Sequence, residues 1–123
     1  MVGLTPNALQ VLERRYLLRD DEGLTVETPA GMFRRVAAGV AEAEPGGLRA
    51  SWTERFEQRM AALEFLPNSP TLMNAGRPHG QLAACFVLPV GDDLEQIFDA
   101  LKWAALIHQS GGGTGFSFSR LRP

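Results

Sequence analysis

The C-terminal third of the chain carries a strand pattern, a helix pattern, a glycine run and a second strand pattern, in that order. The apolar run LAACFVLPV at 82–90 is typical of a strand buried on both faces. Residues 91–110 place apolar side chains at helical spacing, and Asp92 or Asp93 can cap this helix. The alternating FSFSRL at 116–121 predicts the second strand. One crossover helix between two strands gives a parallel pair, and two parallel strands are not a stable sheet alone. We therefore predict an α/β fold, or α+β as a fragment, whose sheet is incomplete in this chain.

Residues 1–64 predict a helical region. Thr5 and Thr28 are each followed by proline, which is a helix-start signal: the threonine caps the helix and the proline takes the first position, where its missing N–H costs nothing. After the breaker EPGG at 44–47, we expect Ser51 to cap a third helix. Apolar side chains recur on one face of each predicted helix, and we interpret them as core packing.

The composition of the sequence changes at Phe65. Residues 65–80, FLPNSPTLMNAGRPHG, contain three prolines and two glycines, which excludes a continuous helix. The stretch is also too apolar for a disordered linker. We predict an ordered loop with a short extended piece at 71–73. The predicted domain limits are therefore 1–64 for the helical region and 65–123 for the α/β part.

The composition excludes several functional classes. Lys and Arg total 12 against 14 Asp and Glu, and 45% of residues are apolar, which is typical of an ordinary globular protein without a polyanion-binding face. We find no signal peptide and no apolar run that could span a membrane, so we predict a cytoplasmic protein with no membrane partner and no direct nucleic-acid partner. The single cysteine, Cys85, excludes an internal disulfide and a multi-cysteine metal site. The two histidines, His79 and His108, lack metal-ligand spacing, so no metal is expected.

Four of the five residues 111–115 are glycine, and several explanations compete. A P-loop requires a lysine after the glycines, and the dinucleotide fingerprint must open a helix. Here no lysine follows, and the glycines lie after a helix and before a strand, which disfavours both. A helix C-cap accounts for one or two glycines. The others indicate that another group approaches the backbone closely, either a ligand or a neighbouring strand.

Four polar side chains allow a structural interpretation beside a functional one. Cys85 lies in an apolar run and suits a small buried residue. Ser69 and Thr71 flank a proline and suit turn hydroxyls that bond the nearby backbone. His108 lies near a predicted helix end, where a cation is mildly favoured. Taken one at a time, these residues do not identify a site.

Three longer blocks are much more specific. They are LPNSPTLMNAG at 66–76, QLAACFVLPV at 81–90 and ALIHQSGGGTGFSFSRLRP at 105–123. In this order and at these spacings, they resemble the large catalytic chain of ribonucleotide reductase, in particular the adenosylcobalamin-dependent (class II) enzymes. LTPNALQVLERRYLLRD at 4–20 and ETPAGMFRRVA at 27–37 also resemble the helical N-terminal region of that family. The resemblance extends over residues 5–123.

The resemblance implies both a fold and a chemistry. The fold is a helical region followed by a ten-stranded α/β barrel of two parallel half-sheets, to which 65–123 would contribute the entry loop, first strand, first helix and start of the next strand. The chemistry is reduction of ribonucleotides to deoxyribonucleotides for DNA synthesis. A cysteine thiyl radical abstracts the 3′ hydrogen, the 2′ hydroxyl leaves as water, and a cysteine pair becomes a disulfide. Adenosylcobalamin generates the radical, and a thioredoxin-like protein reduces the disulfide back to two thiols.

The same resemblance assigns roles to four residues. Cys85 matches the first cysteine of the redox pair, and Ala84 matches a main-chain contact to the substrate. Ser69 matches the hydroxyl residue that binds the substrate's phosphate, and Gly113 matches a glycine whose backbone lies against the substrate. Ala84 departs from the serine often found before this cysteine. The radical-bearing cysteine, the second cysteine of the pair, the effector loops and most cobalamin contacts lie far downstream in the family and are absent here.

Two interpretations remain open. In the first, the chain is the N-terminal segment of a reductase and is inactive alone; its partners are the remaining part of the reductase chain and a ribonucleoside di- or triphosphate. A class I large chain, which takes its radical from a partner subunit, shares this plan, but the form SGGGTGFSFSRLRP favours the cobalamin class. In the second, the chain is a noncatalytic module that binds a complementary reductase fragment.

Overall fold

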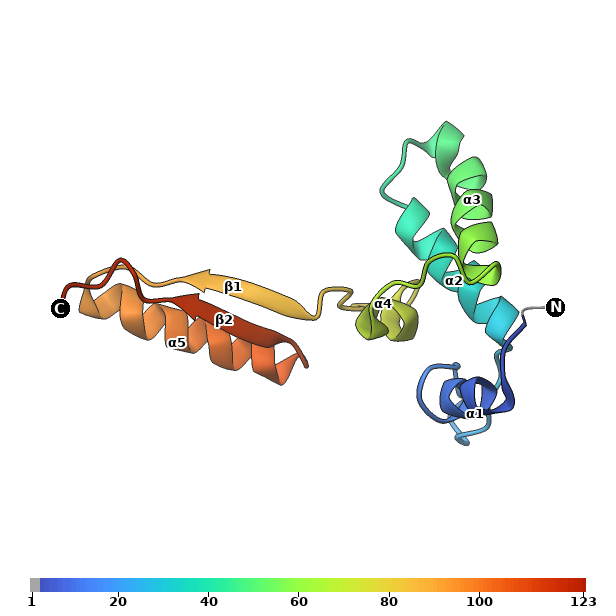
Figure 1. The fold of residues 1–123 in the computed structure, drawn as a ribbon, viewed down its shortest axis with the longest axis horizontal. Helices are drawn as coiled ribbons and strands as arrows, with labels where there is room; N and C mark the ends of the chain where they lie inside the picture. Colours follow the sequence, from blue (N-terminus) through green and yellow to red (C-terminus); the bar gives the residue numbers. More distant parts are fainter. Residues whose placement is uncertain (1–2) are drawn as a thin grey trace. The chain divides into compact units, whose positions relative to one another are not determined.

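The first part of the chain is helical, as the sequence predicts (Figure 1). This computed structural model describes residues 3–123, which divide into two units, one ending at Leu82 and the other covering Ala83–Pro123. The first unit contains α1 (Pro6–Arg15), α2 (Pro29–Ala41), the 3-10 turn η1 (Gly46–Leu48), α3 (Arg49–Ala61) and α4 (Ser69–Asn74). Residues 65–82 belong to the same unit as these helices. The change of composition at Phe65, in contrast, predicts a domain boundary before residue 65. The domain limits 1–64 and 65–123 stay a prediction.

Two of the three predicted helix starts in this unit are confirmed. Thr5 and Thr28 are the N-caps of α1 and α2, and each hydroxyl oxygen accepts a hydrogen bond from the backbone N–H three residues later, at 3.2 and 3.1 Å. The prediction for Ser51 is wrong. Helix α3 begins at Arg49, directly after η1, and Ser51 lies in its first turn, where its hydroxyl donates to the carbonyl oxygen of Leu48. The 3-10 turn leads straight into the helix, so α3 begins without a side-chain cap.

Helix α2 supplies half of the buried core cluster of the first unit, and α3 and α4 both contact it. Met32, Phe33 and Val36 of α2 are the largest fully buried side chains. Burying such side chains is the dominant favourable contribution to folding. The buried cluster consists of Leu17, Met32, Phe33, Val36, Ala37, Met60, Leu72 and Ala75.

Residues Ser69–Asn74 form helix α4, so the predicted extended piece at 71–73 is wrong. Pro70 occupies the first turn of α4, where the helix needs no N–H from it. Asn68 caps the helix, because its Oδ1 accepts a hydrogen bond from the N–H of Thr71 at 3.0 Å. The prolines therefore limit the length of a helix here without excluding one.

Arg35 joins α2 to the C-terminal end of α4. Its guanidinium donates to both carboxylate oxygens of Glu27, at 2.7 and 2.9 Å, and the two side chains are only 12% and 8% exposed. The same group donates to the carbonyl oxygens of Leu72 and Ala75, at 3.2 and 2.7 Å. Carbonyl groups at a helix end have no hydrogen-bond partner within the helix. The planar guanidinium of arginine has five N–H donors, so it can donate to these carbonyl oxygens and to the carboxylate at the same time.

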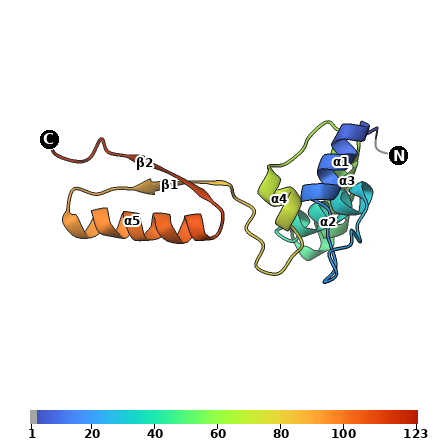
Figure 2. The same ribbon diagram turned by 90° about the horizontal axis from the view of Figure 1, so that it is seen from below.

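The second unit consists of β1 (Cys85–Pro89), α5 (Leu94–Gln109) and β2 (Gly113–Ser117). The two strands pair in parallel, as the strand–helix–strand pattern predicts. Asp93 is the N-cap of α5, and its Oδ1 accepts a hydrogen bond from the N–H of Gln96 at 3.0 Å, so this predicted cap is confirmed. Figure 2 shows α5 along one side of the strand pair. No further helix or strand is present among residues 83–123 to cover the other side.

The strands differ from the sequence prediction in two respects. Strand β2 begins at Gly113, not at Phe116, because main-chain pairing with β1 extends into the glycine run. Strand β1 is not buried on both faces in this chain: alternate residues are exposed, and Val87 is 82% exposed. The unit is thus an open two-stranded sheet, as an incomplete α/β fold predicts.

Helix α5 buries small residues and exposes large ones. Ala100 and Ala104 are its buried residues. Three of the apolar side chains that recur at helical spacing in this segment, Leu94, Phe98 and Leu101, are 61–72% exposed. The apolar face predicted from the helical period exists, but nothing in the described residues covers it.

We predict that Arg35→Met lowers the free energy of unfolding by about 3 kcal/mol, because it leaves the buried carboxylate of Glu27 without its partner. Arg34→Met is the matched control, since Arg34 is the exposed neighbour on the same helix, and it should change stability by less than about 0.5 kcal/mol. Urea unfolding followed by circular dichroism measures both variants. Equal midpoints for the two would contradict the anchoring role of Arg35.

Candidate functional site

Three of the four predicted site residues meet where the two strands begin. Cys85 opens β1, Gly113 opens β2, and the two are partners in the parallel pairing. The N–H of Gly113 donates to the carbonyl oxygen of Ala84 at 2.8 Å. The structure therefore brings Ala84, Cys85 and Gly113 together, although the sequence separates them by the whole of α5.

The thiol of Cys85 belongs to the uncovered side of the strand pair, which we call the open face. Alternation along β1 assigns Cys85, Val87 and Pro89 to this face, and all three are exposed. The intervening Phe86 and Leu88 are half-buried on the side of α5. Cys85 is a free cysteine and is exposed, so the interpretation of it as a small buried residue is wrong for this chain.

The glycines at 111–115 differ in whether the structure requires a glycine at their position. Gly111 has a φ of +88°, the left-handed conformation of a helix C-cap, so the C-cap prediction is confirmed at this position. At Gly113, a Cβ would meet only the Ala84 carbonyl oxygen at 3.7 Å, which is an ordinary contact. At Gly115, a Cβ would meet nothing within 4 Å. The described residues therefore leave room for a side chain at Gly113 and at Gly115, both on the open face. If glycine is required at either position, the group that requires it is not among the described residues.

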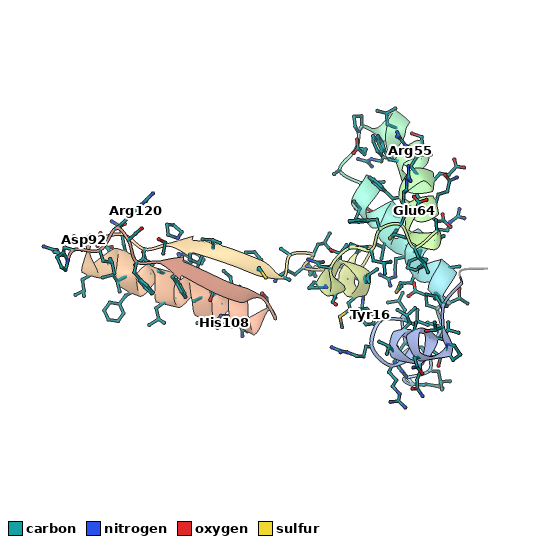
Figure 3. All side chains as sticks on the ribbon, in the orientation of Figure 1. Tyr16, Arg55, Glu64, Asp92, His108 and Arg120 are labelled. Atoms are coloured by element: carbon teal, nitrogen blue, oxygen red, sulfur yellow. The ribbon has the colours of Figure 1, made fainter. Side chains whose placement is uncertain are left out.

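The junction between α5 and β2 is held by side chains. Nε2 of His108 lies 2.8 Å from Oγ1 of Thr114, and Figure 3 labels His108 at the end of α5 where β2 begins. The hydroxyl of Ser110 donates to the carbonyl oxygen of Ile107 at 2.7 Å. The first contact connects the last turn of the helix to the strand that carries Gly113, and the second closes the helix end itself. His108 thus has a defined partner, which its position near a helix end does not indicate.

Ser69, the fourth predicted residue, belongs to the first unit. It is the first residue of α4, and it is exposed. Its hydroxyl oxygen lies 2.9 Å from the hydroxyl oxygen of Tyr16. Sequence reasoning did not single out Tyr16 for this contact, since 53 residues separate the pair and helical spacing marks Tyr16 only as an apolar position.

The chemistry available from these residues is that of one accessible thiol beside bare backbone. Among residues 3–123, no group of three His, Cys, Asp or Glu side chains is arranged to hold a metal ion. In the same range, no helix combines the length and the hydrophobicity needed to cross a membrane. A thiol of this kind can act as a nucleophile or give up electrons by forming a disulfide, and the second process requires another thiol.

Comparison with known protein families gives two matches that together span nearly the whole chain. Residues 2–80 match the family model described as the all-alpha domain of ribonucleotide reductase. Residues 83–123 match the model described as the barrel domain of ribonucleotide reductase. The gap between the two matches coincides with the division between the two structural units at Leu82.

Comparison with individual proteins gives relatives of much greater length. A vitamin B12-dependent ribonucleoside-diphosphate reductase from Thermoplasma acidophilum is 44% identical over 98% of this chain and 23% of its own length. An enzyme of the same name from Mycobacterium tuberculosis is 51% identical over 94% of this chain and 17% of its own length. A ribonucleoside-diphosphate reductase large chain from Schizosaccharomyces pombe is 38% identical over 92% of this chain and 13% of its own length. The chain thus spans less than a quarter of these relatives.

We predict that Gly113→Ala leaves the stability of the 123-residue chain unchanged or slightly higher, because a Cβ fits and a glycine loses more chain entropy on folding. Gly39→Ala is the contrasting variant. Its Cβ would lie 2.6 Å from the backbone nitrogen of Gly76, so we expect a loss of about 1–3 kcal/mol. Thermal unfolding of both variants tests this difference. A loss at Gly113 as large as that at Gly39 would mean that the packing of the chain itself demands glycine at 113.

Proposed function

Because the chain belongs to the family of ribonucleotide reductase large chains, we propose that it is the N-terminal segment of an enzyme that reduces ribonucleotides to deoxyribonucleotides. The substrate is a ribonucleoside diphosphate, as the names of the relatives state for those proteins. The remaining part of the reductase chain completes the barrel and the site. A thioredoxin-like reductant and a cytoplasmic location belong to the same proposal.

The proposed cofactor of the complete enzyme is adenosylcobalamin. Supporting this, identity is 44% and 51% to relatives named as vitamin B12-dependent, against 38% to the yeast large chain. When bound, the cofactor supplies the radical that starts the reaction. The described residues form no site for it: the open face offers one thiol, small residues and no cluster of ligating side chains. We therefore assign its binding to the rest of the enzyme and derive no step through it.

The proposed role of Cys85 is to provide one thiol of the redox pair. Reduction of one ribonucleotide removes the 2′ hydroxyl as water and consumes two electrons and two protons. Two thiols supply both when they form one disulfide. Cys85 is exposed on the open face, where a second thiol from the remaining chain can reach it. A reductant then returns the disulfide to two thiols for the next cycle.

The proposed substrate contacts are the main chain beside that thiol and, separately, the hydroxyl of Ser69. The observation that carries the proposal is the pairing of Cys85 with Gly113 at a position where the described residues leave room for a side chain. A substrate lying against the backbone of Gly113 and the main chain of Ala84 would explain why a glycine stands there. Ser69 provides an uncharged hydroxyl that can donate a hydrogen bond to a phosphate oxygen.

We predict that Cys85→Ser abolishes steady-state turnover of the complete reductase with a dithiol reductant, because the electron pair cannot be delivered by one thiol. Cys85→Ala should do the same, and thermal unfolding should show that both variants are folded. The measurement is deoxynucleotide formation under multiple-turnover conditions. Near-normal turnover in either variant would show that Cys85 is not a member of the pair.

The 123-residue chain alone should form no deoxynucleotide when supplied with adenosylcobalamin, ribonucleotide and dithiol. The reason is that its single cysteine cannot form the intramolecular disulfide that the cycle requires. The complete reductase, assayed under the same conditions, is the positive control. Measurable product from the pure chain would overturn the proposed division of the site between this segment and the rest of the enzyme.

A further inference from the structure

Tyr16 is placed to act on Ser69, the proposed phosphate-binding residue. Tyr16 is the C-cap residue of α1, and its ring packs against the buried core cluster of the first unit. Its hydroxyl oxygen lies 2.9 Å from the hydroxyl oxygen of Ser69. Figure 3 labels Tyr16 beside α1. Two helices that are far apart in the sequence therefore contribute one hydroxyl each to a single contact.

The side of the contact that carries Tyr16 is held by its neighbours. The N–H of Tyr16 donates to the carbonyl oxygen of Leu12 at 2.9 Å, which closes the last turn of α1. The next residue, Leu17, is buried in the core. The N–H of Leu18 donates to the carboxylate of Glu27 at 3.1 Å. The phenol ring is thus half-buried at the end of a segment anchored on both sides.

The side that carries Ser69 is held equally well. Asn68 caps α4 at the residue before Ser69. At the other end of α4, Arg35 holds the carbonyl oxygens of Leu72 and Ala75. Since Glu27 binds both Leu18 and Arg35, the two sides of the contact share one ion pair. The exposed hydroxyl of Ser69 therefore lies on a fixed helix next to a fixed phenol.

Proton counting shows what this contact can do. A hydroxyl has one proton to donate and two lone pairs that accept. When Tyr16 donates to Ser69, the proton of Ser69 is free to point toward an anion, and donation into the serine oxygen strengthens the bond that the serine makes in turn. A phenol is a stronger donor than an aliphatic alcohol, which favours this direction. Without the phenol, the serine hydroxyl would rotate among several partners, including water.

We propose that Tyr16 is a positioning residue for substrate binding: its hydroxyl donates to Ser69 and directs the Ser69 proton to a phosphate oxygen of the ribonucleotide. This inference rests on the proposed function, in which Ser69 binds the phosphate. Tyr16 itself does not touch the substrate. Its contribution is to hold one uncharged donor in the orientation that an anion requires, so that less ordering is needed when the substrate binds.

The test uses the complete reductase that carries this segment, with Tyr16→Phe as the central variant, since phenylalanine keeps the ring against the core cluster and removes only the hydroxyl. We expect KM for the ribonucleoside diphosphate to rise about fivefold, the usual effect of one hydrogen bond, with kcat unchanged. Ser51→Ala is the matched control, because it removes an exposed hydroxyl of the same unit that bonds only the nearby backbone. It should leave KM and kcat unchanged.

A double-mutant cycle separates positioning from a purely structural contact. Ser69→Ala alone should raise KM by about fivefold to tenfold, and adding Tyr16→Phe to it should raise KM no further, because the two hydroxyls act as one unit. Independent, additive effects of the two variants would overturn the inference. So would a Tyr16→Phe enzyme with a lower unfolding temperature and the parent KM, since that is the signature of a structural bond only.

The outcomes also distinguish this inference from the proposed function beneath it. If Ser69→Ala raises KM and Tyr16→Phe does not, the positioning role fails while the phosphate role of Ser69 stands. If Ser69→Ala leaves KM unchanged, the phosphate role fails and the positioning role with it. Loss of turnover in Cys85→Ser is independent of both results, because the proposed role of the thiol is to supply electrons and not to bind the phosphate.

Discussion

Parallel pairing of β1 with β2 is the interaction on which the candidate site depends. Its hydrogen bonds come from the main chain, so a strand can begin within a glycine run and still pair. This pairing brings the first residue of each strand side by side, and a thiol comes to lie next to backbone that carries no side chain. Helix α5 covers the other side of the pair, and the contact between His108 and Thr114 fixes the junction where β2 begins. An exposed cysteine beside bare backbone is therefore a consequence of sheet register.

The first unit fixes the hydroxyls of Ser69 and Tyr16 through a buried ion pair. The buried pair of Arg35 and Glu27 connects the segment that follows α1, the middle of α2 and the end of α4. A buried ion pair costs free energy to desolvate, and it is tolerated when further hydrogen bonds satisfy the remaining donors and acceptors. Here backbone N–H and carbonyl groups provide those bonds. The result is a fixed platform for Ser69 and Tyr16, built from groups that have no direct role in binding.

Short sequence patterns predicted most helix caps correctly. They failed where the outcome depended on the position of a residue within a helix or strand. Thr5, Thr28 and Asp93 cap helices as expected, because a cap needs only its own side chain and the next few N–H groups. Counting prolines in 65–80 gave the wrong answer for α4, since Pro70 falls in the first turn, where proline is tolerated. The start of β2 was also misplaced, because side-chain alternation cannot reveal main-chain pairing through glycines. The roles assigned to Ala84, Cys85 and Gly113 came from family resemblance. Composition marked Cys85 only as the single cysteine, and the glycine run only as backbone that another group approaches closely.

The sequence by itself determined the family, the order of helices and strands apart from α4, most helix starts and the presence of a single thiol. These properties depend on residue type and short-range spacing. Only the tertiary structure decided that Cys85 pairs with Gly113, that Gly111 alone of the run is a left-handed cap, and that Tyr16 reaches Ser69. It also decided which apolar residues of α5 face the strands. The physical reason is that these contacts join residues far apart in the chain, and their distances are set by the packing of whole elements, which no local propensity encodes.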